Sequence, residues 1–403
     1  MKKKHHISDD PRSITRRELL VTAAKYSVGA ATLGLAYTLS GGAISLAEAA
    51  RSEDAKRKAA KHVLTLGHDG LLDKFPGRAG TPHTSWIHGT LDFKDYIERN
   101  SNGQIYVSVH DGGELGSQTT ALNKVQQGVM QGGSCSTQNG AQLAPIWNVI
   151  DIPYVIGDEE NVWKLIYSKD FNDTVRAASE KRHLTMAYTM PIKRWIEMSV
   201  ALDERVLLPE DLRGTKMRVT GSRLEQAAFD ILPANPTPIA WSEVYSALKD
   251  GAIDGIHISA GSVHDAGMAP VIGQIVNTGW MYNFDSTFLN TRWLNSLGPD
   301  LKEVVMQGSF HAQKKIHDDY EVILRDAIGV LPESADNVGW KGAGTDVTFL
   351  TDTQLQAWKD YLSVENNSEL LNGLIDEFGR EEYETVKSVV AQSGGGEPKP
   401  WWT

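Results

Sequence analysis

The chain has 403 residues, a formal net charge of −11 at pH 7 and a single cysteine, Cys135. An acidic chain of this kind repels nucleic acid and anionic lipid surfaces, so neither is an expected partner. One cysteine excludes an internal disulfide and the usual thiolate motifs for metal, haem and iron–sulfur groups. No other cofactor signature is present, so we expect no cofactor.

Residues 1–49 are predicted to be an export signal. The pair Arg16-Arg17 stands before a weakly apolar stretch at 19–46 that is rich in Ala, Gly and Thr, and Ala47-Glu48-Ala49 is a small-x-small cleavage site. The alternative is a signal-anchor helix that stays in the membrane. Such a helix needs about 20 predominantly apolar residues, whereas Lys25-Tyr26-Ser27 and several glycines interrupt this stretch. We therefore expect twin-arginine export to the periplasm, cleavage, and no stable membrane insertion afterwards.

The first third of the remaining chain alternates strand and helix patterns. A short strand ends near Gly67-His68-Asp69, and residues 86–103 have apolar side chains at helical spacing, with a glycine at the end. Residues 105–109 alternate as a strand, and residues 122–129 mark one face of a further helix. Alternation at this spacing favours a largely parallel sheet covered by helices.

A second α/β unit begins at the turn 209–214. A strand at 215–220, a loop at 235–238, a helix from Ser242 to Gly251 and a strand at 252–256 follow it. A long helical segment spans about 300–332. Two units of this type predict a two-lobed α/β fold with a hinge and a ligand cleft between the lobes. We expect lobe I to comprise 62–192 plus about 283–320, lobe II to comprise 193–282 plus about 321–391, and 392–403 to form a flexible tail.

Arg218 is the first candidate for ligand binding. It lies in a predicted strand between Met217 and Val219 and should therefore point to the face opposite these apolar neighbours. An arginine held on a strand presents a rigid planar fork that matches a carboxylate. The alternative is an arginine on a solvated strand face, and the spacing leaves both interpretations open.

Two further segments are candidates. Arg194 could bind a ligand or a structural carboxylate, and Trp195 beside it could stack on a ligand or fill the core. The polar segment 132–140, with Ser136 and Gln138, precedes a predicted helix start whose amides favour anions, or it is an ordinary polar loop. The remaining candidate ligand-binding residues are Asp69 at a strand end, His257, and the aromatic residues Trp280 and Tyr282 as walls for a carbon skeleton.

No pattern typical of catalysis is present. The sequence lacks a Gly-x-Ser-x-Gly elbow, a phosphate-cradling Gly-Lys-Ser/Thr loop and a His-Glu-x-x-His metal motif. We therefore expect no enzyme activity and no metal site. The rival hypothesis is a periplasmic enzyme that is exported in the folded state.

Several motifs occur in the order found in one protein family. They are Leu115-Gly116-Ser117-Gln118, Ile152-Pro153-Tyr154, the block Pro209-Glu210-Asp211-Leu212-Arg213-Gly214 with Lys216-Met217-Arg218-Val219, Asn235-Pro236-Thr237-Pro238, Glu243-Val244-Tyr245, and Asp254-Gly255. This chain resembles the DctP family, the periplasmic solute-binding proteins of TRAP transporters, over about residues 62–365.

The resemblance implies a periplasmic-binding-protein fold with two lobes and long connecting elements, including a long helix. It also implies capture of a small organic acid and its delivery to the membrane subunits of a TRAP transporter, although a sensory binding protein is an alternative. The family's carboxylate-binding arginine corresponds to Arg218, and a second, less uniform arginine position falls near Arg194. The chain departs from the family pattern at Ile258, where an asparagine that helps to fix the ligand is common.

Overall fold

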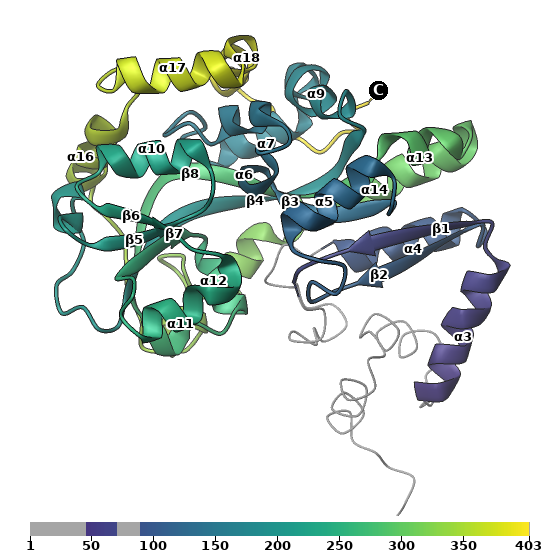
Figure 1. The fold of residues 1–403 in the computed structure, drawn as a ribbon, viewed down its shortest axis with the longest axis horizontal. Coiled ribbons are helices and arrows are strands. Elements are labelled where there is room, and N and C mark those ends of the chain that lie inside the picture. Colours follow the sequence, from purple (N-terminus) through teal and green to yellow (C-terminus); the bar gives the residue numbers. More distant parts are fainter. Residues whose placement is uncertain (1–45, 71–88, 403) are drawn as a thin grey trace, which may run out of the picture.

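The computed structural model describes residues 46–70 and 89–402 (Figure 1). Most of the predicted export signal, residues 1–45, lies outside the described residues, as does Trp86. The last residues of that signal begin α3 (Leu46–Ala59), which leads into the first strand. Within the described part of the chain, no helix is long and apolar enough to cross a membrane.

One mixed sheet runs through the whole molecule. Its strand order is β2-β1-β3-β8-β4-β7-β5-β6, and β9 pairs with β8 beyond this path. The outer strands pair in parallel, as expected from the alternating sequence pattern, whereas β4 and β8 in the middle are long and antiparallel. The strands are β1 (His62–Gly67), β2 (Ile105–His110), β3 (Gly132–Ser136), β4 (Leu184–Ser199), β5 (Lys216–Val219), β6 (Asn235–Pro238), β7 (Gly255–Ile258), β8 (Ile272–Asn290) and β9 (Asp346–Thr348).

The apolar cores divide the molecule into two lobes, which confirms the predicted two-lobed α/β fold. One cluster includes Ile192 of β4 and Tyr282 of β8. Further along the same strands, Trp195 of β4 belongs to a second cluster and Met281 of β8 belongs to a third. The core therefore changes where β4 and β8 cross from one lobe to the other. The helices of lobe I are α4 (Thr90–Asn100), α5 (Gln118–Gln127), α6 (Thr137–Gly140), α7 (Glu159–Tyr167), α8 (Lys169–Phe171), α9 (Ala177–Glu180) and α13 (Thr291–Ser296).

Lobe II has apolar clusters on both faces of its part of the sheet. Its helices are α10 (Arg223–Ile231), α11 (Val244–Lys249), α12 (Ala260–Asp265), α15 (Gly339–Gly342) and α16 (Asp352–Leu362). Helix α10 also packs on lobe I, because Leu224 and Ala227 belong to the lobe I cluster. The long helix α14 (Pro299–Ile323) connects the lobes, because Tyr320 packs in the lobe I cluster and Ile323 in a lobe II cluster. Ser242, expected as a helix N-cap, lies instead inside the short turn before α11.

The C-terminal segments differ from the expected division. The buried residues of α17 (Ser368–Phe378) and α18 (Arg380–Val390) belong to the lobe I cluster, whereas the sequence analysis expects this region in lobe II. Figure 1 shows both helices on the side of α7 and α9. The segment expected to be a flexible tail also packs on lobe I. Trp401 is only 7% exposed, and its ring centroid lies 4.0 Å from the guanidinium carbon of Arg176.

An irregularity marks the crossing of the two long strands. The pairing of β4 with β8 shifts between Arg194 and Ile196, which oppose Met281 and Val276. Gly279 lies in the bulged part of β8 with φ +54°, a conformation that glycine adopts without strain. The bulge therefore sets Arg194 at the junction between the lobes.

Candidate functional site

A cleft of about 590 Å³ lies between the lobes, at the carboxyl ends of their parallel strands. Lobe I contributes residues that follow β1, β2 and β3, and lobe II contributes residues that follow β5, β6 and β7. Polar groups collect at such edges because the strands end there and the next segments turn outward. Among the described residues that line the cleft, the charged ones are Asp69, Arg194, Arg218 and Asp285.

Arg218 reaches the cleft from β5 as the strand alternation predicts, since Met217 and Val219 are buried in the lobe II core. The side chain is 5% exposed and its Nε donates to the carbonyl of Ile239 at 3.0 Å. Nη1 is buried and has no hydrogen-bond partner among the described residues. Burial is the main cause that lowers the pKa of Arg218, to about 10, so the group keeps its charge at neutral pH. The guanidinium also lies 5.9 Å from the ring centroid of Trp241.

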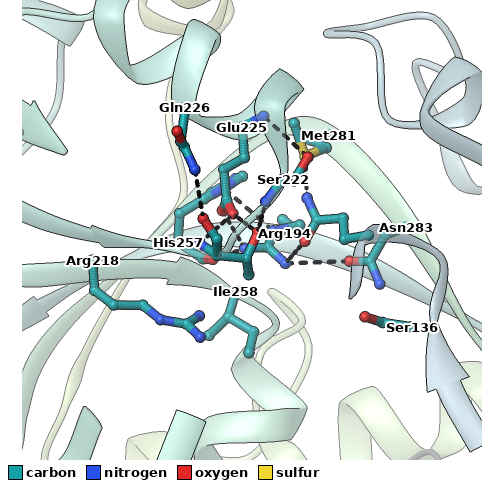
Figure 2. A network of polar contacts seen from close by, with 12 residues as sticks. Ser136, Arg194, Arg218, Ser222, Glu225, Gln226, His257, Ile258, Met281 and Asn283 are labelled. Atoms are coloured by element: carbon teal, nitrogen blue, oxygen red, sulfur yellow. Dashed lines mark hydrogen bonds and ion pairs between the residues drawn. The ribbon is translucent and has the colours of Figure 1, made fainter. Parts of the chain in front are cut away.

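Arg194 has a different environment, although it lines the same cleft. Nη1 donates to Oε1 of Gln138 at 2.6 Å and to Oδ1 of Asn283 at 3.4 Å, and Nη2 donates to Glu225 and to the carbonyl of His257. The fifth donor, Nε, faces Nδ1 of His257 at 3.2 Å. An arginine has five N–H donors, so the protein itself uses the binding capacity of Arg194. Figure 2 shows this network apart from Arg218, whose guanidinium lies beside Ile258.

Glu225 is the counterion of Arg194. Its second oxygen accepts the amide of Thr220 at 2.7 Å and the Thr220 hydroxyl. Burial opposes ionisation of this carboxyl, but the Arg194 charge and the contact with His257 outweigh burial and hold the pKa of Glu225 well below its usual range. The network therefore contains a fully buried ion pair.

His257 lies beneath the network. Its ring is fully buried and stacks on Trp280, with centroids 4.1 Å apart and planes at 2°. Burial and the neighbouring Arg194 lower the pKa of His257 to about 3, so the ring is neutral. Nδ1 lies 3.0 Å from Glu225 and also faces Nε of Arg194. Nδ1 can donate to Glu225 or accept from Arg194, but it cannot do both.

The lobe I side of the cleft is acidic. Asp69 accepts a hydrogen bond from Nε2 of Gln118 at 2.8 Å, and Oε1 of Gln118 accepts from the amide of Ser136 and from Asn139. Burial raises the pKa of Asp69 to about 6. Asp285 projects from β8, and burial followed by repulsion from Asp69 raises the pKa of Asp285 to about 8.

The structure brings together five of the residues predicted from the sequence. Asp69, Ser136, Gln138, Arg194 and Arg218 all line the cleft, as does Ile258. The other four lie elsewhere. His257 and Trp280 are buried below the cleft, Trp195 points to the opposite side of β4, and Tyr282 packs in the lobe I core.

Several lining residues were not predicted, namely Gln118, Trp241, Asn283 and Asp285. Asn283 and Asp285 alternate with Tyr282 and Phe284, and both aromatic residues are buried in lobe I. This two-residue period could have placed the polar pair on one strand face. No sequence signal links Glu225 to Arg194, because they lie on different elements and meet only through the fold.

Comparison with known proteins agrees with this architecture. A family model for DctP, bacterial extracellular solute-binding protein, family 7, matches residues 77–364. The ectoine-binding periplasmic protein TeaA of Halomonas elongata is 26% identical over 75% of this chain and 86% of the relative. The 2,3-diketo-L-gulonate-binding periplasmic protein YiaO of Escherichia coli is 25% identical over 67% and 78%, respectively.

A solved structure shows the same fold. It is a TRAP periplasmic solute-binding protein from Ralstonia eutropha with bound (S)-2-acetolactate, with a TM-score of 0.69 at 21% identity, covering 82% of this chain and 99% of the other. The family match extends over most of the chain and agrees with the resemblance found in the sequence. The chain therefore belongs to the DctP family of bacterial extracellular solute-binding proteins.

Proposed function

We propose that this protein captures a small organic acid in the cleft, binds its carboxylate through Arg218, and delivers it to the membrane subunits of a TRAP transporter. It binds its ligand without transforming it. The relative YiaO and the Ralstonia structure, which is named for bound acetolactate, support a ligand of this class.

One observation carries the proposal. Arg218 is a buried cation at the cleft surface, and its Nη1 has no hydrogen-bond partner among the described residues. A buried donor without a partner is unfavourable, and a carboxylate would satisfy it with a charge-assisted hydrogen bond. Arg194 stays in its network and supports the cleft floor, so we assign it no direct contact with the ligand.

The lobes supply different contacts, and this difference drives closure. Arg218 and Trp241 belong to lobe II, whereas Ser136, Gln118 and Asp69 belong to lobe I. Only the closed form lets one ligand contact both sets, and a ligand shifts a conformational equilibrium only by its difference in affinity for the two forms. Rotation about the β4–β8 crossing is the corresponding hinge motion.

The test is isothermal titration calorimetry with the organic acid that stabilises the protein most in a thermal-shift screen. Arg218→Ala should weaken binding by about 10- to 100-fold, the equivalent of one charge-assisted hydrogen bond. Its melting temperature without ligand should change little, because the side chain makes one hydrogen bond to the protein. The control is Arg213→Ala in the same segment, where Arg213 pairs with Glu210 on the exposed surface. Unchanged affinity in Arg218→Ala would exclude this residue as the anion anchor.

We further propose that the protein reaches the periplasm by the twin-arginine route. The sequence of the first 49 residues supports this proposal. Replacement of both Arg16 and Arg17 by Lys should leave the precursor in the cytoplasm, as measured by cell fractionation. Normal export of that variant would indicate the general secretory route.

A further inference from the structure

We propose that the cleft selects zwitterionic ligands, with a carboxylate bound by Arg218 in lobe II and a protonated nitrogen bound by Asp69 and Asp285 in lobe I. The ligand class is thus an amino acid or a related molecule with an ammonium or amidinium group. This inference rests on the proposed function and narrows it to a subset of organic acids.

The first argument is charge balance in the cleft. Arg194 is paired with Glu225, which leaves Arg218 as the cation and Asp69 and Asp285 as the acids among the described lining residues. A simple organic anion would neutralise Arg218 but would supply no cation with which an ionised Asp69 or Asp285 could pair. A dicarboxylate would add a further negative charge beside them. A zwitterion supplies one charge of each sign and satisfies both sides of the cleft.

The second argument concerns the hydrogen bonding of the two acids. Oδ1 of Asp69 is buried and has no hydrogen-bond partner among the described residues, while Oδ2 accepts from Gln118. Nδ1 of His68 lies 3.9 Å from Oδ1, which is longer than a hydrogen bond. Within the described part of the chain, no side chain donates a hydrogen bond or forms an ion pair with the carboxylate of Asp285.

A protonated nitrogen fits this pair better than a hydroxyl group does. Ionisation of either carboxyl is opposed by burial, and repulsion from Asp69 further raises the pKa of Asp285. A hydroxyl group could satisfy one oxygen but would supply no charge with which an ionised carboxylate could pair. An ammonium or amidinium group supplies both the donors and the charge.

The groups that bind the carboxylate and the protonated nitrogen lie on different lobes. The ligand's charges therefore determine how strongly it favours closure of the lobes. Arg218 is fixed on β5 of lobe II, whereas Asp69 follows β1 and Asp285 lies within the lobe I half of β8. A zwitterion that spans the cleft attracts both lobes at once, whereas an acid without a cation interacts electrostatically with Arg218 alone. Closure around the zwitterion is therefore favoured more strongly.

The test uses amino acids of up to about ten carbons, linear, branched and cyclic, because the cleft admits small ligands. Each is compared with the hydroxy acid and the dicarboxylate that have the same carbon skeleton. Thermal shift with the purified protein selects the best set, and calorimetry gives the affinities. We expect an amino acid to bind at least about tenfold more tightly than its hydroxy and dicarboxylate analogues.

The isosteric variants Asp69→Asn and Asp285→Asn test whether these two acids bind the protonated nitrogen. Each should weaken binding of the amino acid by about thirtyfold, as expected when one partner of a buried charge pair is removed. Binding of the hydroxy acid should change little. Glu114→Gln is the control, because Glu114 is an exposed lobe I carboxylate outside the cleft lining. The melting temperature of each variant without ligand shows whether it is folded.

A second readout does not depend on the variants. Asp285 faces Asp69 and Arg194, and its raised pKa of about 8 means that it is largely protonated in the empty cleft at pH 7. Binding of an ammonium group should ionise it and release about one proton, which is measured from the heats in two buffers of different ionisation enthalpy. The hydroxy acid should release none.

The outcomes separate this inference from the proposed function. If hydroxy acids or dicarboxylates bind as tightly as the amino acids and the two Asn variants bind normally, the zwitterion inference is overturned and the role of Arg218 stands. If no carboxylate of any kind binds, both fail. If the amino acids bind tightly and lose affinity in both Asn variants with loss of proton release, the inference is supported.

Discussion

Glu225→Gln tests the most deeply buried charge pair of the protein. Glu225 is fully buried and Arg194 is 2% exposed, so neither charge has water as an alternative partner. Gln has nearly the same shape, but its single oxygen cannot replace both carboxylate oxygens. If that oxygen accepts from Arg194, the amide nitrogen faces the Thr220 amide, which is also a donor.

The loss of stability follows from the geometry. Removal of one partner of a buried ion pair costs about 3–5 kcal/mol, because the remaining charge stays buried without compensation. Two other buried acids, Asp151 and Glu197, interact with Arg194, and burial raises the pKa of both well above its usual range. One of them can ionise in the variant and offset part of the loss. We therefore expect about 3 kcal/mol, the lower end of that range.

Thermal unfolding gives the first measurement. Unfolding entropy of about 2.1 cal/mol/K per residue gives about 0.7 kcal/mol/K for about 350 residues, so a loss of 3 kcal/mol lowers the Tm by about 4 °C. The control is Asp376→Asn, which breaks an exposed pair with Arg380 and should leave the Tm unchanged. An unchanged Tm in Glu225→Gln would refute the argument that this pair stabilises the fold.

The pH dependence of the same variant gives an independent check. The folded-state pKa of Glu225 is depressed, so its contribution is present above the unfolded pKa of about 4.3 and is lost as the pH falls below that value. The difference in stability between the wild type and Glu225→Gln should therefore shrink between about pH 4.3 and pH 2. A constant difference over that interval would show that the loss comes from packing instead of charge.

Two further predictions concern the cleft itself. Asp285→Asn should stabilise the ligand-free protein by about 1–2 kcal/mol at pH 8. Because burial raises the pKa of Asp285 to about 8, ionisation opposes folding increasingly as the pH rises from about 4 to 8, so the gain in Tm should be smaller at pH 5. Equal gains in Tm at pH 5 and pH 8 would show that the stabilisation does not come from the ionisation of Asp285. Ile258→Asn should weaken ligand binding by about tenfold through loss of roughly 60 Å² of apolar contact, measured by calorimetry. Tighter binding would show that the ligand presents a polar group to Ile258.

The fold was largely predictable because its signals are local. The alternation of Met217, Arg218 and Val219 placed the arginine on the cleft face of its strand. The core changes between Ile192 and Trp195, where β4 passes from one lobe to the other. The lobe of the C-terminal helices is not predictable from the sequence, because their apolar stripes show that they pack but do not show against which lobe.

The site was less predictable because the roles of its two arginines depend on distant residues. Sequence spacing leaves open whether Arg194 binds a ligand or a structural carboxylate, and whether Arg218 binds a ligand or lies on a solvated strand face. The difference arises from Glu225, which stands three residues after Ser222 at the start of α10. That spacing is typical of a capping box, in which the acid turns back to its own helix. In the fold the carboxylate instead extends to Arg194 of β4, which lies 31 residues earlier in the chain.

The two arginines at the junction between the lobes have different roles. Arg194 stabilises the fold, whereas Arg218 is proposed to bind the ligand. The Arg194 network includes Gln138 and Asn283 from lobe I and Glu225 and His257 from lobe II, so it joins the lobes even without ligand. A hinge needs such a fixed point, because rotation without one would misplace both halves of the cleft. Arg218 lies outside the network, and its Nη1 has no partner among the residues that the structure describes, so this donor is available to a ligand. Loss of Glu225 should therefore affect folding first, and loss of Arg218 should affect binding alone.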